Sequence, residues 1–254
     1  SLGIGEVAYQ NSLAYAKDRL QSRALTGPKL KDKPADPIIV HPDVRRMLLT
    51  QKAYTEGARA LCYWTGLMID QYHKHPDAAT RENAEALVEL LTPIVKAFIT
   101  DNTFESTNHA MQVFGGHGFI KEWGMEQYVR DARINLIYEG TNTIQSLDLI
   151  GRKVLSDGGS RLLRFGKLVQ DFAASQADKP EMLEFLKPLG DVSKLVQELT
   201  AEIGKRAQQN PDEIGAAAVP YLRVVGHLVY AYLWARMAQL ALVGIAAGKT
   251  DVDF

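Results

Sequence analysis

The sequence predicts an all-α protein, an antiparallel bundle of four-helix type followed by a second helical domain. Through most of the 254 residues, apolar side chains recur at intervals of three and four, which is the spacing of one helix face. No run alternates apolar and polar residues around a hairpin turn, so we expect essentially no sheet. Long helices joined by short connections are typical of antiparallel bundles.

The first three helices are expected over about 2–20, 42–75 and 79–114. A stretch with three prolines and three lysines, 27–37, predicts an exposed connection after the first helix. Pro42 and Asp43 suit a helix start, because proline lacks an N–H and an acid faces the positive helix end. Pro93 is a candidate kink in the third helix, which the glycines of 115–118 end.

The remaining helices are expected over about 123–133, 142–155, 160–176, 181–208 and 212–247, with a break at 136–141. Pro188 and Gly190 together form a candidate division within 181–208. Two adjacent glycines follow Asp157 and indicate a break between domains. We therefore expect one domain over 1–156 and a second over 157–254.

Composition excludes several classes of protein. Hydrophobic residues make up 46% and charged residues 23%, with a net charge of −1, which is an ordinary globular mixture. Neither half is basic enough to suggest a nucleic-acid or anionic-membrane surface, so none is expected. The single cysteine, Cys62, excludes a disulfide framework and is interpreted as a buried, inert thiol. Glu105 and His109 do not complete a di-iron pattern, so no metal site is expected.

The most apolar region, 216–247, is interpreted as a buried helix and not as a membrane span. Arg223 and Arg236 interrupt it with 12 residues between them, whereas a span needs roughly 20 predominantly apolar residues. Residues 1–20 lack the basic start and apolar stretch of a signal peptide.

Two short blocks are candidate ligand contacts. Over 112–118 (Gln-Val-Phe-Gly-Gly-His-Gly), two adjacent glycines at a helix end expose the backbone. Over 138–145 (Tyr-Glu-Gly-Thr-Asn-Thr-Ile-Gln), Thr141 or Asn142 can cap the next helix, whose free N–H groups attract electron-rich ligands. Glu139 stands just before that helix. A plain helix stop and a solvated loop glutamate are the alternatives for each block taken alone.

Together with Arg-Asp-Ala-Arg-Ile over 130–134, these blocks resemble the acyl-CoA dehydrogenase family in order and spacing. Residues 15–21 are similar to the signature on the first helix of that family's C-terminal four-helix domain. Residues 41–49 and 56–61 resemble its large bacterial branch. That branch acts on unusual short or sulfur-containing acyl-CoAs and carries an extra C-terminal helical domain.

The resemblance is close over 1–156 and loose over 157–254. The family's N-terminal helical and middle β domains have no counterpart here, nor does its Asp-x-x-Arg substrate contact. The chain begins with Ser1 and leads at once into a helical pattern, so we expect a C-terminal fragment of a longer polypeptide.

The resemblance implies a flavoprotein of fatty acid metabolism that dehydrogenates an acyl-CoA thioester between its α and β carbons. Glu139 matches the base that removes the α-proton, while the β-hydride goes to N5 of FAD. Tyr138 and Gly140 flank this base at the substrate. A carboxylate kept out of bulk water beside Tyr138 is a better proton acceptor near neutral pH. The backbone N–H of Glu139 is expected to bind the thioester oxygen.

The resemblance also implies the FAD contacts Arg19, Gln21, Gln112, Gly115, Gly116, Thr141 and Thr143. Arg19 matches an arginine at the diphosphate, and Gln112 with Gly116 matches residues that receive the adenosine half. His41 stands where relatives often have glutamine. Because the residues that match Arg19, Gln21, Gln112 and Gly116 serve the flavin of a neighbouring subunit in the family, a homodimer or homotetramer is expected.

The other implied partner is an electron-transfer flavoprotein or similar acceptor, and the implied location is the bacterial cytoplasm. Two alternatives stay open. The first is an acyl-CoA oxidase, which passes electrons to oxygen. The second is a non-catalytic helical module for self-association in which the motif residues are inert.

Overall fold

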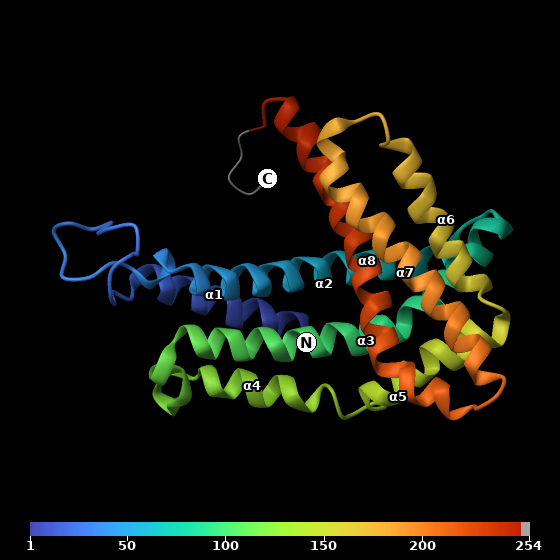
Figure 1. Ribbon diagram of the computed structural model, residues 1–254, viewed down its shortest axis with the longest axis horizontal. Coiled ribbons are helices and arrows are strands. Elements are labelled where there is room, and N and C mark those ends of the chain that lie inside the picture. Colours follow the sequence, from blue (N-terminus) through green and yellow to red (C-terminus); the bar gives the residue numbers. More distant parts are fainter. Residues whose placement is uncertain (250–254) are drawn as a thin grey trace. The chain divides into compact units, whose positions relative to one another are not determined.

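The computed structural model describes residues 1–249, and within them the chain is helical with no strand (Figure 1). An isolated bridge between Leu20 and Pro37 accompanies the helices. The α-helices are α1 (Leu2–Asp18), α2 (Pro42–Lys74), α3 (Ala78–Val113), α4 (Met125–Ile134), α5 (Asn142–Leu147), α6 (Ser160–Ser175), α7 (Leu183–Ala207) and α8 (Asp212–Ala246). The prediction of an all-α protein is confirmed.

One expected division is wrong, and one expected helix changes type along its length. The helix predicted over 142–155 occurs, but it is α-helical only to Leu147, continues as a π-helix over Asp148–Val154 and ends in a 3₁₀ turn. The division predicted at Pro188 and Gly190 does not occur, since α7 runs unbroken through both. Because Pro188 has no N–H, the carbonyl of Glu184 lacks its usual hydrogen-bond donor in the helix. Both residues are exposed, so water can donate to that carbonyl instead. Likewise, α3 continues through Pro93.

The chain divides into two compact units. The first contains residues 1–59 and 99–141, and the second contains residues 60–98 and those from 142 onward. The long helices α2 and α3 therefore contribute one part to each unit. The domain division expected at 156 stays a prediction.

The first unit is a four-helix arrangement in which consecutive helices alternate in direction (Figure 1). It consists of α1, the first part of α2, the last part of α3, and α4. One cluster of its core joins Tyr9 and Ala16 of α1 to Met47 and Val113. A second cluster packs Phe114 with residues of α1, α3 and α4. These contacts bring the C-terminal ends of α1 and α3 together, and this junction positions the candidate site.

The second unit contains α5 to α8 with the remaining parts of α2 and α3. The helix α8 packs against α7 and α5. Close packing is required at Gly226, where a Cβ atom would lie 2.4 Å from the ring of Phe98. In the same unit, Trp64 and Phe165 pack around Tyr232 with ring centroids 5.8 and 5.6 Å away. Aromatic packing therefore joins α2, α6 and α8 within this unit.

By length and composition alone, α8 is apolar enough to cross a membrane. Single helices of this kind are weak evidence, because core helices of other proteins pass the same test. Twelve residues of α8, Tyr221 and Val225 among them, are buried in the structure. This burial is partial, because 39% of the most apolar 18-residue window of α8 is buried, so the helix interpreted as buried over 216–247 is only partly so.

Candidate functional site

A cavity of about 510 Å³ opens in the first unit, where α1, the connection to α2, and the end of α3 meet. Its volume falls in the range of about 300–1,000 Å³ that small-molecule sites occupy. The lining residues with polar groups or bare backbone are Tyr15, Arg19, Gln21, Ser22, His41, Gln112, Gly115, Gly116 and His117. The structure thus brings five of the predicted flavin contacts into one cavity, together with His41.

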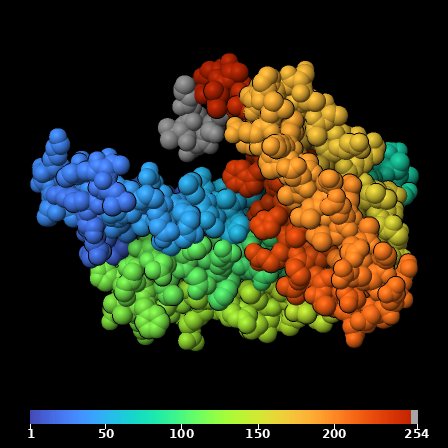
Figure 2. All heavy atoms as spheres, in the orientation of Figure 1, coloured from blue at the N-terminus to red at the C-terminus, as the bar shows by residue number. Residues whose placement is uncertain are grey.

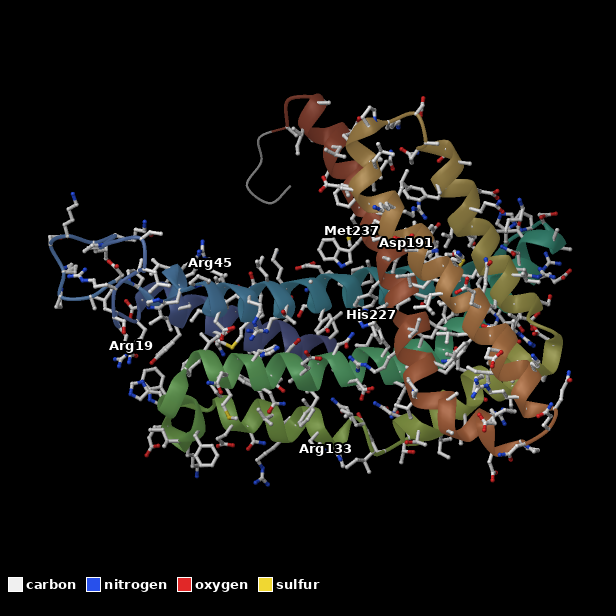
Figure 3. All side chains as sticks on the ribbon, viewed as in Figure 1. Arg19, Arg45, Arg133, Asp191, His227 and Met237 are labelled. Carbon is white, nitrogen blue, oxygen red and sulfur yellow. The ribbon has the colours of Figure 1, made fainter. Side chains whose placement is uncertain are left out.

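Arg19 supplies a positive charge at this cavity. The helix α1 ends at Asp18, and Arg19 is extended, with its N–H donating to the Tyr15 carbonyl at 2.8 Å. Its side chain is exposed where the chain leaves α1 (Figure 3). A guanidinium binds phosphate with two parallel hydrogen bonds, so Arg19 suits an anionic ligand.

The segment that carries Arg19 and Gln21 pairs with a segment just before α2. The N–H of Gln21 donates to the Asp36 carbonyl at 2.9 Å, and the N–H of Asp36 donates to the Ser22 carbonyl at 2.9 Å. The N–H of Ile38 donates to the Arg19 carbonyl at 2.8 Å. The connection between these two segments protrudes at the surface of the unit (Figure 2).

Within this connection, Asp36 is fully buried, although the sequence predicts an exposed stretch over 27–37. Burial raises the pKa of its carboxyl, but hydrogen bonds from three loop N–H groups and from Arg23 outweigh that effect and lower it to about 2. Sequence reasoning missed this residue. The available signal was an aspartate inside a proline- and glycine-containing stretch, where its carboxylate can accept backbone N–H bonds.

The other wall of the cavity is the turn after α3. Gly115 has a φ of 59°, which favours glycine. At Gly118 a Cβ atom would lie 2.4 Å from the Met111 carbonyl oxygen, so a side chain does not fit. At Gly115 and Gly116 a Cβ atom would meet nothing within 4 Å, so the backbone there faces open space. A ligand can therefore approach this backbone closely, as the glycine pair predicts.

An aromatic cluster ties α1 to this turn. The rings of Tyr15 and Phe114 stack with centroids 4.0 Å apart, and those of His117 and Trp123 stack at 4.9 Å. The Tyr15 hydroxyl and Nδ1 of His117 form a hydrogen bond of 2.9 Å. Since Arg19 lies one helical turn beyond Tyr15, these contacts hold its backbone beside the turn that carries Gly115.

Glu139 lies in the connection between α4 and α5, outside the residues that line the cavity. Its φ is 55°, and that of Gly140 is 83°. Within residues 1–249, Glu139 and Ser22 are the non-glycine residues with positive φ. Such backbone costs about 1–3 kcal/mol and concentrates at functional sites. The Glu139 side chain is exposed, so the described residues do not provide the expected exclusion from bulk water.

Three further predicted residues accompany Glu139. The Tyr138 hydroxyl donates to Oδ1 of Asn135 at 2.8 Å, so this ring is held against the end of α4. Thr141 precedes α5 and Thr143 lies in it, and both side chains are exposed. Of the two candidate caps, Asn142 is already the first residue of α5.

The side chain of Asn142 contacts α3. Its Oδ1 accepts from Nζ of Lys96 at 2.7 Å, and its Nδ2 donates to the Ala97 carbonyl at 3.3 Å. Asn142 therefore fixes the start of α5 against α3 within the second unit.

No group of three or more His, Cys, Asp and Glu residues that could hold a metal occurs within residues 1–249. Cys62 is half-buried, and burial raises the pKa of its thiol, which favours the unreactive neutral form.

Comparison with known proteins gives two family matches. Residues 1–155 match the family described as acyl-CoA dehydrogenase, C-terminal domain, and residues 165–254 match acetyl-CoA dehydrogenase C-terminal like. The chain is 40% identical over its whole length to 3-methylmercaptopropionyl-CoA dehydrogenase of Ruegeria pomeroyi, of which it covers 42%. It thus spans about two fifths of that relative's length.

Two solved structures share the fold. Caenorhabditis elegans ACDH-11 in complex with C11-CoA superimposes with a TM-score of 0.76 and 19% identity, over 91% of this chain and 36% of that one. An acyl-CoA dehydrogenase from Bacillus anthracis complexed with FAD gives a TM-score of 0.65 and 21% identity, over 99% of this chain and 41% of that one.

Proposed function

Because the chain belongs to the acyl-CoA dehydrogenase family, we propose that it is the C-terminal part of an FAD-dependent enzyme that dehydrogenates an acyl-CoA thioester between its α and β carbons. The observation that carries this proposal is the backbone of Glu139, a carboxylate held at positive φ in an exposed connection. Residues in such strained conformations concentrate at functional sites, so this backbone supports a functional role for Glu139.

The cavity at the end of α1 fits the diphosphate and adenosine parts of FAD. Arg19 supplies the charge for the diphosphate. The open backbone of Gly115 and Gly116 and the amide of Gln112 supply polar contacts for the adenosine. Gln21 and His41 complete the cavity wall. The Bacillus anthracis relative was solved with FAD, which supports this choice of ligand.

Thr141 and Thr143 do not line this cavity, so one chain has two separate groups of proposed flavin contacts. We assign the cavity to the flavin of a neighbouring subunit, and the segment around Glu139 to the flavin of its own subunit. A homodimer or homotetramer follows from this assignment, because each flavin then needs residues from two chains.

In the proposed reaction, the Glu139 carboxylate accepts the α-proton of the thioester. FAD, when bound, accepts the hydride from the β carbon. The Glu139 backbone N–H donates a hydrogen bond to the thioester oxygen and stabilises the charge that develops there. The nearby apolar side chains of Ile134, Ile137 and Tyr138 are exposed, so the remaining domains can cover this segment and exclude water from the carboxylate.

For the electron acceptor we propose an electron-transfer flavoprotein or a similar protein, and for the location the bacterial cytoplasm. As the substrate class we propose a sulfur-containing acyl-CoA, because the name of the Ruegeria pomeroyi relative specifies one.

The proposal is tested on the full-length protein with a panel of acyl-CoA thioesters and an artificial electron acceptor. We expect a yellow protein whose flavin absorbance bleaches on addition of an acyl-CoA under anaerobic conditions. Rapid recovery of the absorbance in air would indicate an oxidase. A colourless protein that fails to take up added FAD would contradict the proposal and favour a non-catalytic helical module.

A further inference from the structure

We propose that Asp36 is a positioning residue that holds Arg19 and Gln21 in place to bind the dinucleotide. This inference rests on the proposed function, since it takes the ligand of the cavity to be FAD. Asp36 does not line the cavity itself, so it acts through the segment that carries the two contact residues.

The backbone of Asp36 joins two walls of the cavity. Its carbonyl accepts from Gln21 and its N–H donates to Ser22, which fixes the segment after α1 against the segment before α2. The Gln21 carbonyl in turn accepts from Nε2 of His41 at 3.0 Å. Both backbone polar atoms of Gln21 are therefore bound, and the direction in which its side chain leaves the chain is set.

The buried carboxylate of Asp36 binds several groups of the protruding connection between α1 and α2. Its Oδ2 accepts from the N–H of Ala24 at 3.0 Å, and its Oδ1 accepts from the N–H groups of Lys29 and Leu30, both at 2.8 Å. The Arg23 guanidinium adds a salt bridge of 3.2 Å to Oδ1. One buried carboxylate thus satisfies three backbone donors and a charge, all from the connection that follows Gln21.

The strained backbone at Ser22 shows what this network supports. Its φ of 62° is unfavourable for serine, and the chain bends at this residue. The Asp36 N–H donates to the Ser22 carbonyl, and the Asp36 carboxylate forms a salt bridge with Arg23, so Asp36 binds both residues at this bend. Removing the carboxylate leaves the buried N–H of Ala24 and the partly buried N–H groups of Lys29 and Leu30 without this acceptor, which favours rearrangement of the connection. The segment that carries Arg19 and Gln21 then loses support on its C-terminal side.

The experiment measures FAD affinity in the full-length enzyme after the flavin is removed, using Asp36→Ala, Asp36→Asn and the control Asp32→Asn. Asp32 is exposed in the same connection, so its variant removes the same charge without touching the network. We expect the Kd for FAD to rise by about tenfold or more in Asp36→Ala, because three donors lose their acceptor. Asp36→Asn keeps one acceptor oxygen and should show a smaller rise, and Asp32→Asn should show none.

Two readouts separate positioning from a general loss of structure. If Asp36 acts on the dinucleotide contacts, kcat at saturating FAD and KM for the acyl-CoA stay at wild-type values in Asp36→Asn. If the wild-type enzyme binds FAD and the Asp36 variants bind it with the same affinity, this inference is overturned and the proposed function stands. Variants that lose kcat at saturating FAD in proportion to their loss of folded protein would also overturn it. A wild-type protein that binds no FAD would overturn both proposals.

Discussion

Residues 19–22 and 138–141 both contain a non-glycine residue in the left-handed region, but their surroundings differ. At Ser22 the reason lies within the fold, because the buried Asp36 and its partners hold the bend in the chain. At Glu139 the side chain is exposed, and Gly140 beside it also has positive φ. The first conformation therefore builds a wall of the cavity, whereas the second presents a carboxylate. Under the roles that we propose, the backbone strain at Ser22 serves positioning and the strain at Glu139 serves chemistry.

The largest effect is expected from Glu139→Gly in the full-length enzyme. Glycine relieves the backbone strain, so the free energy of unfolding should rise by up to about 1 kcal/mol. Turnover should nevertheless fall by about 10²–10⁴-fold, because the general base is lost. Denaturant unfolding and steady-state rates, measured on the same preparation, test both effects. Turnover close to wild type would contradict a chemical role for Glu139, and the proposed reaction would then not explain its strained backbone.

Arg19→Ala should weaken FAD binding by about 10–100-fold, since hydrogen bonds to charged groups contribute about 1.5–3 kcal/mol. Arg45→Ala is the matched control, because Arg45 is an exposed arginine of α2 that does not line the cavity (Figure 3). Fluorescence titration of the flavin-free enzyme measures both. Equal losses in the two variants would indicate a general charge effect instead of a phosphate contact.

The low pKa of Asp36 predicts a pH dependence of stability. Its folded-state pKa of about 2 lies below the ordinary value of about 3.9, so the unfolded chain binds the proton more readily between these values. The contribution of Asp36 is fully present above about pH 4 and is lost as pH falls toward 2. Urea unfolding should show a gap between wild type and Asp36→Asn that is constant at neutral pH and shrinks below pH 4. A gap independent of pH over that interval would contradict the assignment.

The smallest effect is expected from Ser22→Gly. Glycine adopts positive φ without strain, so stability should change by no more than about 1 kcal/mol, in the favourable direction. FAD affinity should stay at the wild-type value because the hydrogen bonds of the Ser22 backbone are retained. Thermal unfolding with a parallel FAD titration measures this. A large loss of FAD affinity would show that the Ser22 side chain binds the ligand. Ser22 and Glu139 would then both be strained residues whose side chains contact a ligand.

Local signals in the sequence predict most of the helices. The start of α2 at Pro42 and the end of α3 before Gly115 follow from residues whose backbone chemistry acts locally. The unbroken α7 could not be predicted, because the cost of Pro188 depends on whether Glu184 is exposed to water. That exposure is a tertiary property.

The candidate site divides in the same way. The resemblance names Arg19, Gln112 and Gly116, and the structure places them in one cavity. The burial of Asp36 depends on pairing between segments on either side of a long connection, which no local periodicity reveals. The positive φ of Glu139 is equally hidden, because sequence preference assigns that conformation to glycine and asparagine.

Flavin reduction in a full-length Glu139→Gln enzyme is the sharpest test of Glu139 as the base. This substitution keeps the size of the side chain and most of its hydrogen bonding but cannot accept the proton. We expect a rate of flavin reduction by acyl-CoA that is about 10²–10⁴-fold lower. Bound FAD should stay near the wild-type amount, and acyl-CoA affinity should change far less than the rate. A Glu139→Gln enzyme that reduced its flavin at half the wild-type rate would contradict the claim and place the base on another residue.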